Sequence, residues 1–348
     1  MHFMKKMTML GAVVALSAAS TVQAAEHNWK MATGWGGGPL MEIGAKAFAD
    51  KVKFLTDGRV EIKVFPAGQL SKGLEVRAAV AKGVAEAGHT WPGYDWGKDK
   101  TTVLFGGYAG SMDSERMLHW LYEGGGLAMW QQFNEEQFKL ISFPCFIRTA
   151  EAFLHSRKPV KTLADLAGLK LRTAGAWLEI SKNLGAAPVT TPGGEVYTML
   201  ERGAIDATEW GTLWEDISTG FHKVAKYVII PGVHQPVAPF EMVINPGAWN
   251  KLSARDKTLV EMAAKMVTFE TWTRIGQEDA KALEFYKKEG NKVIVLDADV
   301  QRKAKKLGLE WADKQAKDNP WFAKVLKSQR EFEKLWSQAS YYRNVVSD

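Results

Sequence analysis

The chain has 348 residues, of which 46% are hydrophobic and 24% charged, the ordinary balance of a soluble protein of about two domains. This composition excludes intrinsic disorder, a collagen repeat and a polytopic membrane protein. The formal net charge is only +6 and the longest basic runs are pairs such as Lys287-Lys288, so the sequence does not predict nucleic-acid binding. A single cysteine, Cys145, excludes an intrachain disulfide.

The N-terminal segment has the pattern of a secretory signal peptide. Lys5 and Lys6 precede an apolar stretch over residues 9–19, and small residues follow up to Ala24. Roughly 11 apolar residues are too few for the ~20 that span a bilayer, which favours cleavage over a retained anchor. We therefore expect residues 1–24 to be removed after export and the mature protein to reside in the periplasm.

The mature chain begins with alternating strand and helix patterns. Residues 28–33 and 60–65 are strand-like, and residues 39–55 between them have apolar side chains at helical spacing. A second helix over residues 73–82 and a strand over residues 85–90 continue the alternation. Strands joined by helical crossovers form parallel sheets, so we expect a parallel α/β unit here.

A second unit of the same kind follows a helical middle over residues 113–134 and a strand over residues 138–145. Its predicted elements are three strands and two helices, at residues 169–173, 175–184, 188–190, 194–202 and 205–210. The sequence therefore predicts two α/β units side by side.

The last third of the chain is expected to connect the two units. Residues 227–230 and 241–245 are strand-like and are interpreted as segments that cross back between them. Residues 253–290 contain no proline and predict one helix of roughly 50 Å, longer than a single small domain is wide. An amphipathic helical tail follows over residues 300–342.

Catalytic and nucleotide-binding motifs are absent from the sequence. It contains neither G-x-S-x-G nor G-x-x-x-x-G-K-[ST], and its histidines lack metal-site spacing. The glycine-rich segment 34–39 ends in proline and does not match a dinucleotide loop, so it is interpreted as a loop beside a ligand.

Several sequence segments, which follow one another in the same order, resemble the solute receptors of tripartite ATP-independent periplasmic (TRAP) transporters. Residues 160–172 contain the D-L-x-G-L-K-x-R pattern, and the similarity continues in order and spacing through residues 184–189, 193–210 and 223–227. It extends from residue 65 to the long helix. The segments P-G-G-E-V-Y and A-T-E-W look most like the branch that receives 2-oxo and 2-hydroxy monocarboxylates together with a cation. The resemblance implies a receptor for a small organic anion that works with membrane permease subunits.

Arg172 is the residue that the resemblance identifies as the carboxylate-binding arginine. It closes a predicted strand at the end where a parallel sheet opens its ligand crevice. A guanidinium group there offers two parallel hydrogen bonds to a planar carboxylate.

The resemblance also implies a cation site. It assigns the Glu209 side chain, the Trp210 backbone carbonyl and Glu241 on a later strand as ligands. Acids that face an anionic ligand need a positive ion between them. Because these ligands are all oxygens, Na⁺ or Ca²⁺ is expected.

The chain departs from the family pattern where the branch supplies a glutamine to the cation. Here Glu151 falls nearest that position, three residues after Arg148. Glu151 favours a divalent ion, whereas Arg148 adds a second anion clamp that suits a sulfonate or a diacid. Both interpretations stay open, and so does the ligand. Trp35 and Trp177 follow strands on the presumed cleft side and are predicted to line the pocket.

The predicted fold is therefore an α/β periplasmic binding protein of the Venus-flytrap type, with two lobes and a long helix bracing both. Lobe I comprises residues 25–147 with about 235–265, and lobe II comprises residues 148–234 with the C-terminal helices at about 266–348. We expect no catalysis. The alternative from another class is a periplasmic enzyme that uses Glu209 and Glu241 as acid and base. The tail helices either form a homodimer or pack within the chain.

Overall fold

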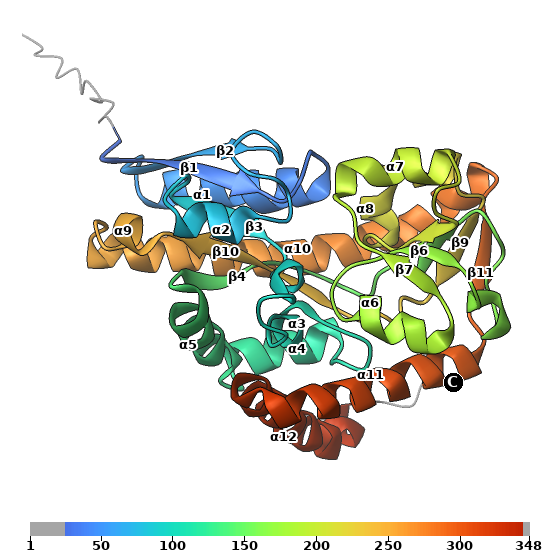
Figure 1. Cartoon of the computed structure of the whole chain (residues 1–348). Coiled ribbons are helices and arrows are strands. Elements are labelled where there is room, and N and C mark those ends of the chain that lie inside the picture. The colour runs from blue at the N-terminus through green and yellow to red at the C-terminus, as the bar shows by residue number, and fades with distance from the viewer. Residues whose placement is uncertain (1–24, 344–348) are drawn as a thin grey trace, which may run out of the picture.

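The computed structural model describes residues 25–343, and the predicted signal peptide lies outside this range. Two mixed β-sheets form its centre (Figure 1). The first has five strands in the order β2-β1-β3-β10-β4, with bounds β1 (His27–Thr33), β2 (Val60–Phe65), β3 (Ala87–Thr90), β4 (Ile141–Arg148) and β10 (Ala238–Ile244). The second has six strands in the order β11-β9-β5-β8-β6-β7, with bounds β5 (Leu154–Ser156), β6 (Lys170–Arg172), β7 (Ala187–Val189), β8 (Ala207–Thr208), β9 (Tyr227–Ile230) and β11 (Lys292–Val295).

The first sheet is parallel only in part. Strands β1, β2 and β3 are parallel, as the sequence predicts, but β10 runs antiparallel to both β3 and β4. Strand β10 enters the sheet late in the sequence, after strands β5 to β9 of the second sheet. The helices beside this sheet are a π-helical turn (Leu40–Lys46) continued by α1 (Ala47–Leu55), and α2 (Val76–Ala81).

The second sheet is also mixed, and here the antiparallel strand is β5, the first of its strands in the sequence. Strands β6, β7 and β8 are parallel to one another, whereas β5 is antiparallel to β8 and β9. Its short helices are α6 (Trp177–Ile180), α7 (Gly193–Glu201) and α8 (Leu213–Ile217). A reciprocal capping box between Thr212 and Glu215 starts α8 and places the Glu215 carboxylate at its N-terminus.

The long helix α10 (Ala254–Lys288) confirms the prediction for residues 253–290. The Ser253 hydroxyl caps its N-terminus by accepting a hydrogen bond from the backbone N–H of Asp256. The helix packs against β4 and α1 on one side of the molecule and against α8 and β11 on the other (Figure 1). It therefore contacts elements of both sheets.

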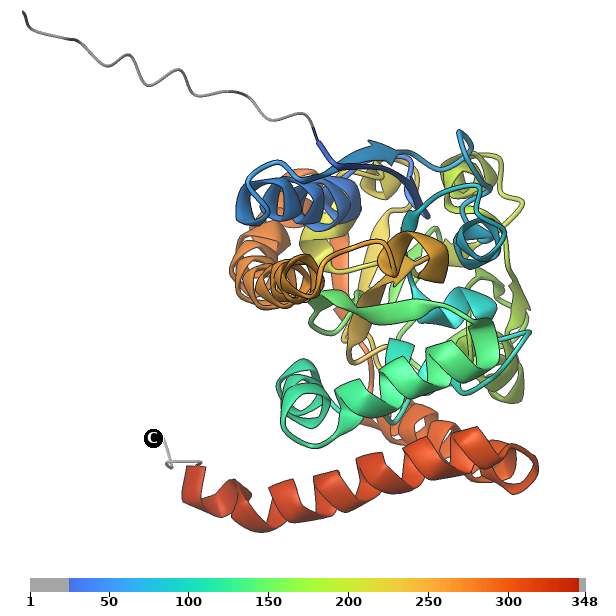
Figure 2. The ribbon, with the colours of Figure 1, turned by 90° about the vertical axis from the view of Figure 1, so that its left-hand side faces the viewer.

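Of the remaining helices, α9 lies at the N-terminal end of α10, and the others form a layer at the other side of the molecule (Figure 1). The bounds of the remaining helices are α3 (Thr102–Gly106), α4 (Ser114–Tyr122), α5 (Gly126–Phe138), α9 (Pro246–Trp249), α11 (Ala298–Asp318) and α12 (Pro320–Arg343). Helix α11 packs on α6, and α12 packs on α3, α4 and α5. Figure 2 shows α12 along the lower edge, with its C-terminal end projecting past the helices above it. Within residues 25–343, no helix is both long enough and apolar enough to cross a bilayer.

Candidate functional site

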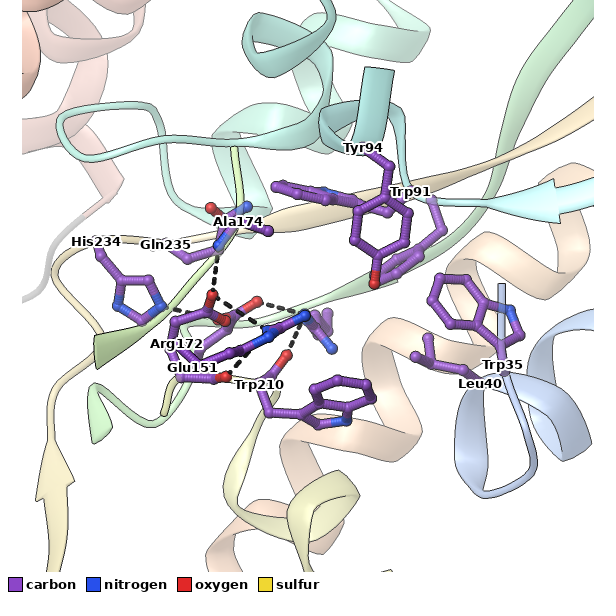
Figure 3. Close-up of a pocket in the computed structure, with 13 residues that line it drawn as sticks. Trp35, Leu40, Trp91, Tyr94, Glu151, Arg172, Ala174, Trp210, His234 and Gln235 are labelled. Carbon is purple, nitrogen blue, oxygen red and sulfur yellow. Dashed lines mark hydrogen bonds and ion pairs between the residues drawn. The ribbon is translucent and has the colours of Figure 1, made fainter. Parts of the chain in front are cut away.

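A pocket lies between the two sheets and holds about 430 Å³ of space. Figure 3 shows aromatic rings on one side of the space and charged groups on the other. The lining residues are Trp35, Leu40, Trp91, Tyr94, Arg148, Glu151, Arg172, Ala174, Glu209, Trp210, His234, Gln235 and Phe240.

Arg172 ends β6 at the carboxyl edge of its parallel neighbours, and its side chain is only 2% exposed. Nη2 donates to the carbonyl of Thr191 over 3.1 Å, and the guanidinium carbon lies 5.1 Å from the ring centre of Trp210. Its carboxylate partner, Oε1 of Glu209, is 3.5 Å from Nη1. A loosely paired guanidinium group stacked on an aromatic ring is well suited to receive a carboxylate.

Glu209 follows the short strand β8 and faces the same space. Its Oε1 accepts a hydrogen bond of 3.0 Å from the backbone N–H of Ala174. Burial raises the pKa of Glu209, and the nearby Arg172 offsets this only in part. The carboxylate is therefore a buried acid that lacks a tight cationic partner.

Arg148 and Glu151 form a tightly coupled pair at the end of β4. Nη2 of Arg148 contacts the Glu151 carboxylate and donates to the Trp210 carbonyl over 3.0 Å. Nη1 of Arg148 donates to Oε2 of Glu215 over 2.8 Å. Burial acts to raise the pKa of Glu151, but the charge of Arg148 and the hydrogen bond with His234 outweigh it and lower that pKa. Arg148 is thus already engaged by two carboxylates.

Two pocket residues that the sequence analysis missed come from the loop after β9. Nε2 of His234 lies 2.9 Å from Oε2 of Glu151. The Gln235 amide nitrogen donates to the carbonyls of Gly106 and Val237, which leaves its amide oxygen as the free acceptor. A lone histidine and glutamine in a loop carry no spacing signal, and only the fold brings them to Glu151.

Glu151, Glu209 and His234 form a group that can hold a metal ion. Each offers one ligand atom, and these atoms lie within 4.8 Å of one another. All three side chains are buried. The structure therefore brings two of the predicted ligands together with an imidazole, beside the Trp210 carbonyl.

The opposite wall is aromatic. The Trp35 indole N–H donates to Nδ1 of His89 over 2.8 Å, and its ring meets that of Phe240 edge to face at 5.4 Å. Trp91 is held by a hydrogen bond from its indole to the carbonyl of Gly106, and Tyr94 packs on Trp91. Of the two tryptophans predicted for the pocket, Trp35 lines it.

The prediction for Trp177 requires correction. Its ring packs edge to face on Phe153, with the ring centres 5.9 Å apart, and lies 5.8 Å from the ring of His234. Trp177 begins α6 and is drawn into the hydrophobic core, so it supports His234 from behind and does not line the pocket.

The prediction for Glu241 is also corrected. Arg77 holds both of its carboxylate oxygens, at 2.6 and 2.7 Å, and the Ser142 hydroxyl donates to one of them. Glu241 is fully buried in this ion pair, whereas its neighbour Phe240 lines the pocket. Glu241 therefore does not join Glu209, and the two acids are not placed to act as an acid–base pair.

A wider groove adjoins the pocket and shares Trp35, Leu40 and Trp210 with it. One side of the groove is the glycine-rich loop 34–39, and the other is the start of α7 with the loop after α8. The glycine-rich loop thus lies beside the candidate site, as the sequence predicts.

Comparison with known proteins identifies relatives along most of the chain. Residues 31–318 match the family model described as "Bacterial extracellular solute-binding protein, family 7". A monocarboxylate 2-oxoacid-binding periplasmic protein of Nostoc sp. is 31% identical over 338 residues, which cover 94% of this chain and 92% of the relative.

Two solved structures of TRAP periplasmic solute-binding proteins have a TM-score of 0.85 with this chain. One is from Pseudoalteromonas atlantica, is 28% identical, and contains bound sodium and pyruvate. The other is from Colwellia psychrerythraea, is 27% identical, and contains bound calcium and pyruvate. Each match covers 92% of this chain and 99% of the other chain. The agreement confirms the predicted α/β fold of a periplasmic binding protein.

Proposed function

The chain belongs to the bacterial extracellular solute-binding protein family 7, and on this premise we propose that it is the receptor of a TRAP transporter for a small organic carboxylate, bound together with a cation. The relatives described above are solute-binding proteins and not enzymes, in agreement with the sequence analysis. The observation that carries the proposal is Arg172, a buried guanidinium group that faces a pocket between two sheets and has only one loosely placed carboxylate partner.

Arg172 is proposed to bind the ligand carboxylate. Its two terminal nitrogens form a fixed fork that matches the two oxygens of a carboxylate. Stacking on Trp210 holds the plane of the guanidinium group, so its orientation is set before the ligand arrives. The aromatic wall of Trp35, Trp91 and Phe240 then contacts the carbon skeleton.

The residues of the pocket fit a cation. Buried carboxylates of Glu151 and Glu209 lie with His234 in a group of the size that one ion needs, and the Trp210 carbonyl is beside them. We propose that Glu151, Glu209 and the Trp210 carbonyl hold the ion. When bound, the cation supplies positive charge that attracts the carboxylate and the 2-oxo or 2-hydroxyl oxygen of the ligand. The sodium and calcium of the two related structures are consistent with this assignment.

The ligand is proposed to be enclosed by movement of two lobes. We divide the chain as the sequence predicts, into residues 25–147 with about 235–265 and residues 148–234 with about 266–348. The strands support this division, because the first sheet contains only β1 to β4 and β10. The pocket takes residues from both parts, such as Trp35 and Arg172, so hinge closure buries the ligand.

We propose a periplasmic location, with residues 1–24 as the signal peptide, and a membrane permease as the partner that recognises the closed receptor.

A homodimer through the C-terminal helices is proposed from α12, whose Leu335 and Tyr342 are 67% and 76% exposed. The end of α12 projects from the molecule (Figure 2). Light scattering tests the dimer, and Leu335→Glu is expected to give a monomer.

Titration of the purified mature chain tests the receptor function. Pyruvate, 2-oxobutyrate, lactate, malonate and a small sulfonate are added in buffers that contain both sodium and calcium. We expect a 2-oxo or 2-hydroxy monocarboxylate to raise the melting temperature, to change tryptophan fluorescence and to be recovered unchanged. A melting curve unmoved by every one of these compounds contradicts the proposal, and consumption of the compound favours an enzyme.

A further inference from the structure

The two C-terminal helices carry all of the net positive charge of residues 25–343. Residues 298–343, which form α11 and α12, contain eleven lysine and arginine residues and six aspartate and glutamate residues, a formal net charge of +5. Residues 25–297 contain thirty-two of each kind and have no net charge. From this asymmetry we propose that the outer face of α11 docks on the surface of a phospholipid bilayer with anionic headgroups.

One face of α11 is a stripe of lysines. Lys303, Lys306, Lys314 and Lys317 recur together with Glu310 at intervals of three and four residues, so they lie on the same side of the helix. All five of these residues are exposed. The buried residues of the helix are Val300, Ala304, Gly308, Trp311 and Ala312. These four lysines, the lysine stripe, therefore point away from the core and extend over roughly 21 Å of helix.

The acidic residues of α11 and α12 leave most of the lysine stripe unpaired. Four of their carboxylates are engaged by basic residues, in the pairs Asp299–Arg302, Glu310–Lys306, Asp313–Arg330 and Glu331–Lys327. Lys306 is thus held loosely by Glu310, at 3.8 Å. No carboxylate of residues 25–343 forms an ion pair with Lys303, Lys314 or Lys317. Their charges are available to an anionic surface.

Basic side chains border both flanks of the lysine stripe. On one flank, Lys182 lines a shallow hollow together with Lys314. Glu179 lines the same hollow, but its carboxylate already accepts a hydrogen bond from Lys100 at 3.0 Å. On the other flank, the hollow between α11 and α12 is lined by Lys327, Arg330 and Lys334. The stripe is therefore a ridge within a broader basic surface.

The composition of this face favours a lipid surface over an acidic protein. Interfaces between proteins are depleted in lysine and enriched in aromatic residues and arginine, and their binding energy is concentrated in well-packed pockets. The lysine stripe instead presents four flexible ammonium groups on a ridge. An anionic membrane attracts each lysine near its surface and does not require a partner of complementary shape.

The basic surface is distant from the ligand groove. Figure 1 shows α11 at the lower edge of the molecule and α7, whose start borders the groove, at the upper edge. A chain that rests on α11 therefore keeps its groove turned away from the lipid. The homodimer proposed above uses Leu335 and Tyr342 of α12, which are not part of the stripe. Lipid docking is thus a property beyond the proposed receptor function.

Sedimentation with sucrose-loaded vesicles tests the proposal on the purified mature chain. One set of vesicles is pure phosphatidylcholine, and the other contains one phosphatidylglycerol for every two phosphatidylcholine molecules. Each set is used at low salt and at physiological ionic strength. We expect binding to the anionic vesicles to be at least tenfold stronger than binding to the neutral ones at low salt. It should weaken at the higher ionic strength, because salt screens exposed charges.

A variant that combines Lys303→Gln, Lys306→Gln, Lys314→Gln and Lys317→Gln is expected to bind the anionic vesicles at least tenfold more weakly. The matched control replaces four exposed lysines elsewhere with glutamine, at Lys82, Lys226, Lys251 and Lys288, and is expected to keep most of the binding. Both variants lose four positive charges, so the comparison separates the position of the charge from the net charge. Circular dichroism checks that both are folded, and the vesicle comparison with the unmodified chain does not depend on either variant.

Equal binding to neutral and anionic vesicles, or binding to neither, overturns the proposal. An equal loss of binding in the two variants also overturns it, because the effect then comes from net charge and not from α11. Binding to soluble polyglutamate without binding to the anionic vesicles assigns the face to an acidic protein and overturns the lipid assignment. Each of these results leaves the proposed ligand site in place.

Discussion

The indole of Trp210 lies against the backbone of Gly193, so closely that a methyl group built on Gly193 falls 1.9 Å from the Cη2 atom of the ring. The same ring stacks on the guanidinium group of Arg172, 5.1 Å away. Gly193 begins α7, so the start of this helix determines where Trp210 lies, and Trp210 in turn positions Arg172.

The variant Gly193→Ala is expected to weaken carboxylate binding at least tenfold, about 1.4 kcal/mol, because Trp210 has to leave its position over Arg172. Gly194→Ala is the matched control, since a methyl group there meets no atom within 4 Å. Calorimetric titration with pyruvate compares the two variants with the unmodified chain. Equal affinities for all three proteins would show that the position of Trp210 does not matter for binding.

Much of the site was predictable because its residues lie in contiguous motifs. Arg172 is the last residue of the D-L-x-G-L-K-x-R pattern, and Glu209 and Trp210 follow a recognisable strand. The long helix was predictable from 35 residues of helical pattern. By contrast, β5 with three residues and β11 with four lie outside these motifs, and both were missed.

The errors concern residues whose partners are distant in the sequence. Glu241 lies in a strand whose seven residues are all buried, so the sequence does not indicate which side of β10 faces the pocket. Its partner Arg77 is 164 positions away, on α2. His234 meets Glu151 across 83 positions for the same reason. Antiparallel insertion of β10 next to β3 is likewise set by the return of the chain and not by a local pattern.

The pH dependence of stability is expected to report on His89, the hydrogen-bond partner of Trp35. Nδ1 of His89 accepts from the Trp35 indole and Nε2 faces the Cys145 carbonyl at 2.9 Å, so the ring is neutral with its proton on Nε2. Burial lowers the pKa of His89 to about 4. The pKa of this base is lower in the folded chain than in the unfolded chain, where it is about 6.5, so its neutral form stabilises the fold fully above pH 6.5. That contribution is lost as the pH falls below 6.5 toward the folded pKa.

When the pH is lowered from 7.5 to 5, His89 is expected to reduce the free energy of unfolding by about 2 kcal/mol. Urea unfolding at both pH values measures the change for the unmodified chain and for His89→Gln. The variant is expected to lose about 2 kcal/mol less than the unmodified chain over this interval. His119→Gln, at an exposed histidine, serves as the control. Identical pH profiles for all three proteins would contradict the assignment of a neutral, buried His89.

The ion pair of Arg77 and Glu241 is expected to matter for stability and not for ion binding. Glu241→Gln leaves the Arg77 charge buried with only Asp95 nearby, at 3.5 Å, and is expected to lower the free energy of unfolding by about 3 kcal/mol. The double variant Arg77→Met with Glu241→Leu is expected to recover most of the loss. A stable Glu241→Gln protein that no longer binds calcium would restore Glu241 as a cation ligand.

Replacement of Arg172 separates the charge of the guanidinium group from its shape. Lysine keeps the positive charge but lacks the planar fork, so Arg172→Lys is expected to weaken pyruvate binding at least tenfold, about 1.4 kcal/mol. Arg172→Gln removes the charge as well and is expected to weaken binding roughly a hundredfold. Calcium binding without organic ligand should persist in both variants, because the proposed cation ligands are Glu151, Glu209 and the Trp210 carbonyl. The control is Arg202→Lys, at an exposed arginine that follows α7. Full pyruvate affinity in Arg172→Gln would remove Arg172 from the site, since no carboxylate anchor of that strength survives the loss of its positive charge.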